Sequence, residues 1–306
     1  MKLCEEHFLS EETVKATYND LELFRSDIEL ATKEAKQMRL SVIRNETSSF
    51  VPTASDIALT FVGNKEIMNE IMRDVNRTRA ELKFFSQTKD GATKHADVLA
   101  KMLFIYTKRY PDTGYVQGMN ELLAVLYFCF QGLEPSPYVE ARFIESDIYF
   151  AFESLMKAMQ ECYYWYNEKI ESLKEILELV DPTLQEVLDM HKIEHHFYGI
   201  RWFRVLMSQE FNIEDTLRLW DCLLVADYQT KGPVGMKFID FVAAAVIKQV
   251  STTIKEQNDP ATMMELLNKA ASNAGTITEI LGRALWICKK WTTESKNKRY
   301  WDLLIY

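Results

Sequence analysis

Two short segments carry polar side chains at positions where an apolar helix would be expected to continue. In the first, Asp74 and Arg77 are three residues apart, so on a helix they share a face and the carboxylate can hold the guanidinium in a chosen direction. A guanidinium is planar and carries its N–H donors in a fixed fork, whereas a lysine ammonium is a point charge. Taken alone, such a pair is most often a solvated ion pair on the surface.

The second segment, residues 114–121, lies at a predicted junction between a loop and a helix. Gly114 and Gly118 bracket Gln117, which relieves backbone crowding on both sides and lets the carboxamide point outward. A glutamine side chain donates and accepts hydrogen bonds, so it is suited to orienting a water molecule. By itself, this segment is typical of an ordinary helix entry.

The composition indicates long helices joined by short connections. The 306 residues include 10 Gly and 7 Pro, whereas average usage would give roughly 21 and roughly 15. Because turn residues are scarce and no useful stretch alternates between apolar and polar residues, we expect an all-α fold. We expect two packed helical lobes, residues 1–180 and 181–306, divided at Asp181–Pro182 and packing as one unit.

Apolar residues that recur in steps of three and four predict the individual helices. The stripe from Val14 to Val42 predicts a long packing helix, with a dimerising coiled coil, and hence a dimeric scaffold, as the alternative. One helix is expected to begin near Asn64, one to end before Pro111 and one to carry Leu122. Further helices are predicted at 139–161, 166–179, 183–191, 200–209, 213–225, 235–250, 260–271 and 276–291.

Charge and cysteine usage limit the partners and the compartment. The net charge is −9 and no basic run is present, which argues against nucleic acid as a partner. The five cysteines are scattered, which is typical of reduced thiols in the cytosol. The apolar runs are far shorter than the roughly 20 residues of a membrane span, and no secretory signal is recognisable. We therefore expect a cytoplasmic protein without a transmembrane segment.

Four other groups of residues have both a functional and a structural interpretation. His191 and His195 are one helical turn apart, as zinc ligands can be, but the glutamate of a zinc-protease motif is missing, so we predict no metal site. Residues 163–166 are interpreted as an aromatic core or a partner-facing patch. Phe84 and Phe85 are interpreted as anchors of their helix, and the alternative is that they shape a groove around Arg77. A group of basic residues near the end of the chain is interpreted as a solvated helix end, and contact with a membrane surface is the alternative. The group consists of Lys289, Lys290, Lys296, Lys298 and Arg299.

Together, the two polar segments resemble motifs of the TBC-domain family of Rab GTPase-activating proteins. Residues 71–77 match Ile-x-x-Asp-x-x-Arg, and residues 115–119 match Tyr-x-Gln-Gly-Met, in the order that the family has. A third family motif consists of Arg-Trp, a later Glu-Phe and then Leu-x-Leu-Trp-Asp. This sequence resembles it at Arg201-Trp202, at Glu210-Phe211 and at residues 217–221. Residues 103–106 and 208–211 are closest to a compact branch that includes the family's member thirteen. The front of the chain departs from the family, because no Trp precedes Trp165.

The resemblance implies a catalytic role for three residues. Arg77 would enter the GTPase's nucleotide site as an arginine finger, Gln117 would orient the attacking water, and Asp74 would orient Arg77. A Rab-type GTPase in its GTP-bound form would be the partner, and it would hold the GTP and Mg²⁺, so the chain would need no cofactor and turn over no substrate of its own. The alternative is a TBC-type binding module without catalysis.

The resemblance also implies roles for the neighbouring residues. Contacts with the partner are expected from Tyr115, Gly118, Met119 and Asn120. Structural roles are expected for Ile71, Arg201, Trp202, Trp220 and Asp221. Because charges among such apolar residues need partners, we expect Arg201 to pair with Asp221 or Glu210 inside the fold. A lipidated GTPase would recruit the protein to intracellular membranes.

Overall fold

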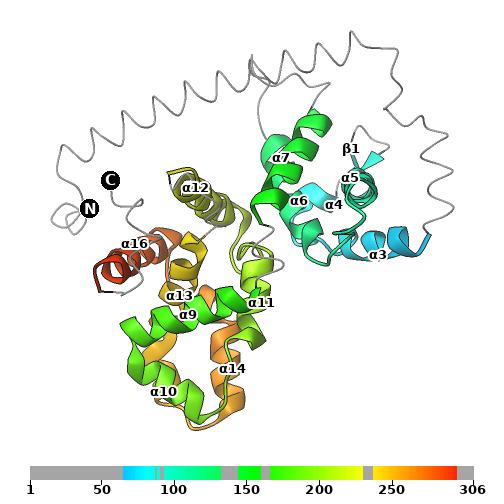
Figure 1. Ribbon diagram of the computed structural model, residues 1–306. Helices are drawn as coiled ribbons and strands as arrows, with labels where there is room; N and C mark the ends of the chain where they lie inside the picture. The colour runs from blue at the N-terminus through cyan, green and yellow to red at the C-terminus, as the bar shows by residue number, and fades with distance from the viewer. Residues whose placement is uncertain are drawn as a thin grey trace. The chain divides into compact units, whose positions relative to one another are not determined.

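The computed structural model describes residues 65–294, except for 87, 90–92, 132–143, 160–165 and 230–236 (Figure 1). The stripe at 14–42 and the basic residues 296–299 therefore lie outside the described residues, as does most of the aromatic run at 163–166.

The first described part of the chain consists of helices and one short hairpin (Figure 1). Its elements are α3 (Lys65–Val75), α4 (Lys83–Ser86), β1 (Thr88–Lys89), β2 (Thr93–Lys94), α5 (His95–Arg109), α6 (Met119–Gln131) and α7 (Ile144–Ala158). Strands β1 and β2 pair in antiparallel register. Helix α6 packs against α3, α5, α7 and α12, so it is the central helix of this part.

The sequence of α6 accounts for its central position. Leu122, Leu123, Ala124 and Val125 are consecutive and all fully buried. Four consecutive residues point to all sides of a helix, so α6 must be surrounded by other elements. Helices with a polar side cover it: in α5, for example, Leu103 is fully buried whereas Lys101 is exposed.

The second described part contains only helices. They are α9 (Tyr166–Val180), α10 (Pro182–Met190), α11 (His196–Arg204), α12 (Ile213–Gln229), α13 (Phe238–Lys255), α14 (Pro260–Asn268), α15 (Ala270–Asn273) and α16 (Ile277–Glu294). Every residue from Phe238 to Ile247 in α13 is buried. This helix contacts α9, α10, α11, α12, α14, α15 and α16, and it is the centre of the second part (Figure 1).

Asp-Pro pairs begin α10 and α14. Asp181 caps α10 by accepting from Leu184 N at 3.2 Å, and Pro182 follows at the first helical position, where no backbone donor is needed. Asp259 caps α14 in the same way. Asp181 is buried, and it also accepts hydrogen bonds from Lys248 at 2.6 Å and from Ser251 of α13. The predicted division into lobes at this point stays a prediction; α9 packs against α10, α11 and α13.

The all-α fold class predicted from the composition is confirmed. Most of the helices described here overlap the predicted ranges, but the range 200–209 was wrong at both ends, since α11 spans His196–Arg204. Leu206 and Met207 have φ values of 48° and 54°, and a right-handed helix cannot continue through this conformation. The β1–β2 hairpin was not predicted, because two-residue strands are too short to show alternation.

The prediction of no transmembrane segment can be compared with the described helices. None of them combines the length and the apolar character that crossing a bilayer would require.

Candidate functional site

Arg77 and Asp74 form an ion pair at the C-terminal end of α3. Asp74 lies in the last turn of the helix, and Arg77 lies in the turn that follows it. Arg77 Nη2 donates to Asp74 Oδ1 at 2.5 Å, and the side chains are 65% and 7% exposed, respectively. The guanidinium is thus accessible to another molecule, while the carboxylate that holds it is fixed inside the protein.

Tyr115 connects the second motif to the same carboxylate. Its hydroxyl donates to Asp74 Oδ2 at 2.8 Å, and it also lies 3.2 Å from Asn120 Oδ1. Since a phenol carries one proton, it can donate to only one of these oxygens at a time. Both carboxylate oxygens of Asp74 therefore have partners, one in each motif, and the segment before Gln117 is attached to the base of Arg77.

The carboxamide of Asn120 makes a second connection between the motifs. Asn120 Nδ2 donates to Thr78 Oγ1 at 2.8 Å, and Asn120 Oδ1 accepts from Gly118 N at 3.1 Å. The Thr78 hydroxyl in turn donates to the backbone oxygen of Asp74 at 2.8 Å. This closed set of hydrogen bonds fixes the turn after α3 against the start of α6.

Gln117 is exposed at the turn that leads into α6. The glycine after it is required for two reasons. Gly118 has φ +106°, and a Cβ atom there would lie 3.0 Å from Val205 Cγ1 and 3.4 Å from Arg204 Cγ. Gly114 also has a positive φ, of +63°, but a Cβ atom there would make an ordinary contact, at 3.9 Å from the Pro111 carbonyl oxygen. Gly118 therefore lets the Gln117 turn lie directly against the end of α11.

The prediction that Gly118, Met119 and Asn120 contact a partner needs correction. Gly118 and Asn120 are buried and Met119 is fully buried, because α6 begins at Met119 and turns these residues toward the interior. Tyr115 is only partly buried. Of the residues proposed for this segment, Gln117 and Tyr115 are thus the ones with side chains at the surface.

Arg79 is an important residue of this site that the motifs did not reveal. It is buried, with φ 48°, and its Nε lies 3.3 Å from Glu121 Oε2 of α6. Its guanidinium also donates to the carbonyl oxygens of Ser208 and, at 3.5 Å, Phe211. Burial raises the pKa of Glu121, and the charge of Arg79 opposes this effect. Arg79 attaches the Arg77 turn to a segment about 130 residues later.

The third motif supports the turns that carry Arg77 and Gln117. Trp202 is fully buried, and Trp220 Nε1 donates to the backbone oxygen of Leu206 at 3.1 Å. The segment after α11 then supplies Val205 against Gly118 and the carbonyl groups that Arg79 binds. The expected structural roles of Ile71, Trp202 and Trp220 agree with their burial.

The expectations for the two charged residues of this motif hold in part. Arg201 pairs with Glu210 as expected, with Nε to Oε1 at 2.7 Å. Burial raises the pKa of Glu210, and the charge of Arg201 opposes the shift. The pair does not lie wholly inside the fold, because the Arg201 side chain is 44% exposed. Asp221 is exposed and has no ion pair within the described residues, because it follows the buried Trp220 by one position and so points away from the core.

Phe84 and Phe85 belong to the packing of α4. The Phe84 ring stacks on His95 with 4.4 Å between centroids and meets Phe128 edge-on at 5.2 Å. These contacts agree with the interpretation of this pair as an anchor for the segment that follows Arg77.

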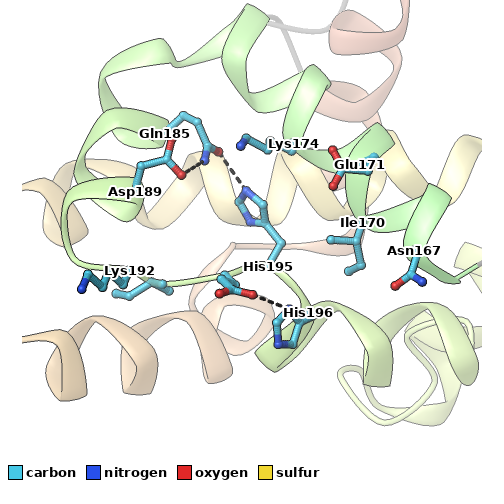
Figure 2. A pocket seen from close by; sticks show the side chains of 11 residues that line it. Asn167, Ile170, Glu171, Lys174, Gln185, Asp189, Lys192, His195 and His196 are labelled. Atoms are coloured by element: carbon cyan, nitrogen blue, oxygen red, sulfur yellow. Dashed lines mark hydrogen bonds and ion pairs between the residues drawn. The ribbon is translucent and has the colours of Figure 1, made fainter.

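The histidines lie near a pocket of about 510 Å³ that α9, α10 and the connection to α11 line (Figure 2). His195 Nε2 lies 2.8 Å from Gln185 Oε1 and its Nδ1 lies 2.5 Å from the Tyr198 hydroxyl. Burial lowers the pKa of His195 to about 4. His196 pairs instead with Glu194, whose Oε2 lies 3.0 Å from His196 Nδ1. Nowhere in the described ranges do three or more His, Cys, Asp or Glu side chains converge as a metal site would require.

The three motifs thus meet in one structure, and a family model decides what they belong to. The model of the Rab-GTPase-TBC domain matches residues 54–255, which is more than half of the chain. The chain belongs to this family. The resemblance inferred from residues 71–77, 115–119 and 201–221 is confirmed.

Relatives of this TBC domain include proteins of the branch that the sequence indicated. TBC1 domain family member 13 of Homo sapiens is 32% identical over 160 residues, which are 50% of this chain and 40% of that protein. TBC1 domain family member 22B of Homo sapiens is 24% identical over 256 residues, which are 78% of this chain and 48% of that protein. The chain thus spans half or less of the length of these relatives.

Solved TBC domains have the same fold. The crystal structure of the Ypt/Rab-GAP domain of Gyp1p is similar, with a TM-score of 0.64 and 19% identity over 87% of this chain and 83% of that one. The Chlamydomonas flagellar RabGAP TBC domain gives a TM-score of 0.57 and 18% identity over 72% of this chain and 67% of that one. This TBC domain therefore shares the all-α architecture of both.

Proposed function

We propose that this TBC domain accelerates GTP hydrolysis by a Rab-type small GTPase in its GTP-bound form, with Arg77 and Gln117 supplied in trans. One observation carries the proposal: the 65% exposed guanidinium of Arg77 is held by a buried carboxylate that also accepts from Tyr115, two residues before the exposed Gln117. Two exposed side chains on one rigid support suit the two functions that a slow GTPase lacks.

Each side chain has a distinct chemical task in this proposal. The guanidinium of Arg77 would neutralise charge that develops on the transferred phosphoryl group. The carboxylate of Asp74 would keep this guanidinium directed outward. The carboxamide of Gln117 would accept a hydrogen bond from the attacking water and fix its direction. The GTPase would hold the GTP and Mg²⁺, and this chain would supply no cofactor.

The test is a phosphate-release assay with a panel of GTP-loaded Rab proteins. Arg77→Ala should lower the stimulated rate by about 10³-fold or more, and Gln117→Ala should lower it by about 10²-fold. Arg73→Ala is the matched control, because Arg73 is also exposed on α3 but, among the described residues, donates only to the Asn69 carbonyl at 3.1 Å. Full stimulation by both finger variants on a responsive Rab would disprove the assignment.

The same panel separates the two classes of function. A catalytic domain stimulates hydrolysis, whereas a binding module binds a GTP-loaded Rab without changing its rate. Binding without stimulation by the wild-type protein would therefore replace the proposal with the non-catalytic alternative.

The proposal includes a location. A lipidated Rab would bring this protein to the cytoplasmic face of an intracellular membrane. In a cell fractionation, removal of the responsive Rab should then shift the protein from the membrane fraction to the cytosol.

A further inference from the structure

Asn120 touches the residue that follows each of the two proposed fingers. Its Nδ2 donates to Thr78 Oγ1 at 2.8 Å, next to Arg77, and its Oδ1 accepts from Gly118 N at 3.1 Å, next to Gln117. The two contacts use opposite ends of one planar carboxamide. A single side chain therefore bridges the two finger turns, beside the bond from the Tyr115 hydroxyl to Asp74.

The surroundings of Asn120 keep this carboxamide in place. Asn120 is 5% exposed and lies in the first turn of α6, whose next residues are fully buried. Thr78 is 3% exposed, and its hydroxyl proton is used on the Asp74 carbonyl, so its oxygen is left to accept from Asn120. The donor and the acceptor are thus defined in both the Asn120–Thr78 bond and the Asn120–Gly118 bond.

Asparagine is the residue of this size and shape that carries both the donor and the acceptor that these contacts need. An aspartate could accept from Gly118 but has no donor for Thr78, and a leucine of similar shape has neither group. A buried donor or acceptor that loses its partner costs roughly 1–3 kcal/mol, so an altered side chain would shift one turn relative to the other to recover a bond.

We propose that Asn120 is a positioning residue that sets the relative position of Arg77 and Gln117, and that it acts on the chemical step and not on binding of the GTPase. This inference rests on the proposed function. Because Asn120 and Thr78 are buried, they do not contact a partner molecule, and their effect must pass through the two exposed side chains. A misplacement of about 1 Å in a reacting geometry can lower a rate by roughly 10²-fold.

The experiment uses Thr78→Val, which keeps the shape of the side chain and removes the hydroxyl, and Thr78→Ser as the variant that retains it. Single-turnover GTP hydrolysis by a responsive Rab is measured over a range of TBC-domain concentrations. Thr78→Val should lower the maximal rate by about 10-fold or more and leave the half-saturating concentration unchanged, and Thr78→Ser should restore the rate. In an Arg77→Ala/Gln117→Ala background, Thr78→Val should cause no further loss.

Amide hydrogen exchange on the free protein gives a second readout that needs no GTPase. Thr78→Val should increase the exchange rate of the Gly118 amide, although the two residues are 40 positions apart, and Asn120→Asp should increase the exchange rate of the Thr78 segment. An unchanged Gly118 rate, or an unchanged maximal hydrolysis rate, overturns the inference. Failure of the wild-type protein to stimulate any Rab would instead count against the proposed function, while the exchange result would still decide whether Asn120 couples the two turns.

Discussion

The hydroxyl of Tyr115 donates to Asp74 Oδ2 at 2.8 Å across 41 residues of sequence. The other oxygen of the same carboxylate accepts from Arg77 at 2.5 Å. A carboxylate with both oxygens bound cannot rotate freely, so the direction of the Arg77 guanidinium depends on the segment that carries Gln117. The two motifs are therefore physically one unit, although each can be recognised separately in the sequence.

Loss of the Tyr115 hydroxyl should weaken both stability and stimulation. Tyr115→Phe removes a hydrogen bond to a charged group, which is worth about 1.5–3 kcal/mol, and the stimulated rate should fall because Asp74 can then move. Denaturant unfolding measures the first effect and phosphate release the second. Tyr149→Phe is the matched control, since the buried Tyr149 hydroxyl has no partner among the described residues; a loss of stability as large as that of Tyr115→Phe would contradict the argument.

Substitution of the glycines should separate conformational strain from crowding. Gly118→Ala combines a φ of +106° with a contact of 3.0 Å to Val205 Cγ1, so it should destabilise by about 2–4 kcal/mol and abolish stimulation. Gly114→Ala has the positive φ without crowding and should cost about 1–2 kcal/mol. Gly282→Ala in α16, where a Cβ meets no atom of the described residues within 4 Å, should stabilise by about 0.5–1 kcal/mol.

These three variants can be compared by thermal or denaturant unfolding of the same chain. The order of stability should be Gly282→Ala, then Gly114→Ala, then Gly118→Ala. An unchanged stability of Gly118→Ala would show that the Gln117 turn is not held against α11.

Arg79 should matter for folding even though it cannot reach a partner. Arg79→Met leaves the buried Glu121 without its cation, which is expected to cost about 3–5 kcal/mol. The double variant Arg79→Met/Glu121→Leu removes both charges and should recover part of that loss in denaturant unfolding. Additive losses from Arg79→Met and Glu121→Leu would mean that the two residues are not coupled.

His195 should make stability depend on pH below neutrality. Burial lowers the pKa of His195 to about 4, whereas an unfolded histidine titrates near 6.5. As the pH falls from about 6.5 to about 4, the unfolded state binds the proton first, so the folded state loses up to about 3 kcal/mol. His195→Gln should remove this part of the pH dependence in unfolding experiments.

His196→Gln is the control for that measurement, because the His196 side chain is 42% exposed and, within the described part of the chain, forms its ion pair with the exposed Glu194. The part of the pH dependence that His195→Gln removes should still be present in this variant. If the stability of His195→Gln depended on pH as steeply as that of the wild-type protein, a group other than His195 would be responsible for the pH dependence.

Helix periodicity was sufficient for much of the fold, and motif spacing for the exposed part of the site. The apolar stripes predicted α9, α12 and α16 because their buried residues recur at helical spacing. The pair Asp74–Arg77 was predicted from a separation of three residues, and the bond exists although Arg77 lies just beyond the helix. Local patterns succeed here because the interacting groups are close in sequence.

The buried half of the site could not be predicted from local patterns. Arg79 binds carbonyl groups about 130 positions away, and no spacing rule indicates a backbone partner so distant. Met119 and Asn120 were assigned to the surface with Gln117, because a motif shows which residues occur together but not which side of a helix entry they face. Asp221 was expected, as one of two candidates, to pair with Arg201 inside the fold, because a charge among apolar residues needs a partner. It follows the buried Trp220 by one position, however, and one residue turns a helix by about 100°.

The contact between Arg79 and the Ser208 carbonyl has a consequence for synthesis of the chain. A nascent polypeptide would expose Arg77 and Gln117 long before residues 205–211 leave the ribosome. Its early portion would therefore contain both motifs without the segment that holds their two turns together. A fragment ending at residue 180 should accordingly be inert even if helical, and addition of a fragment covering 181–306 should restore stimulation only where the two pieces reassemble.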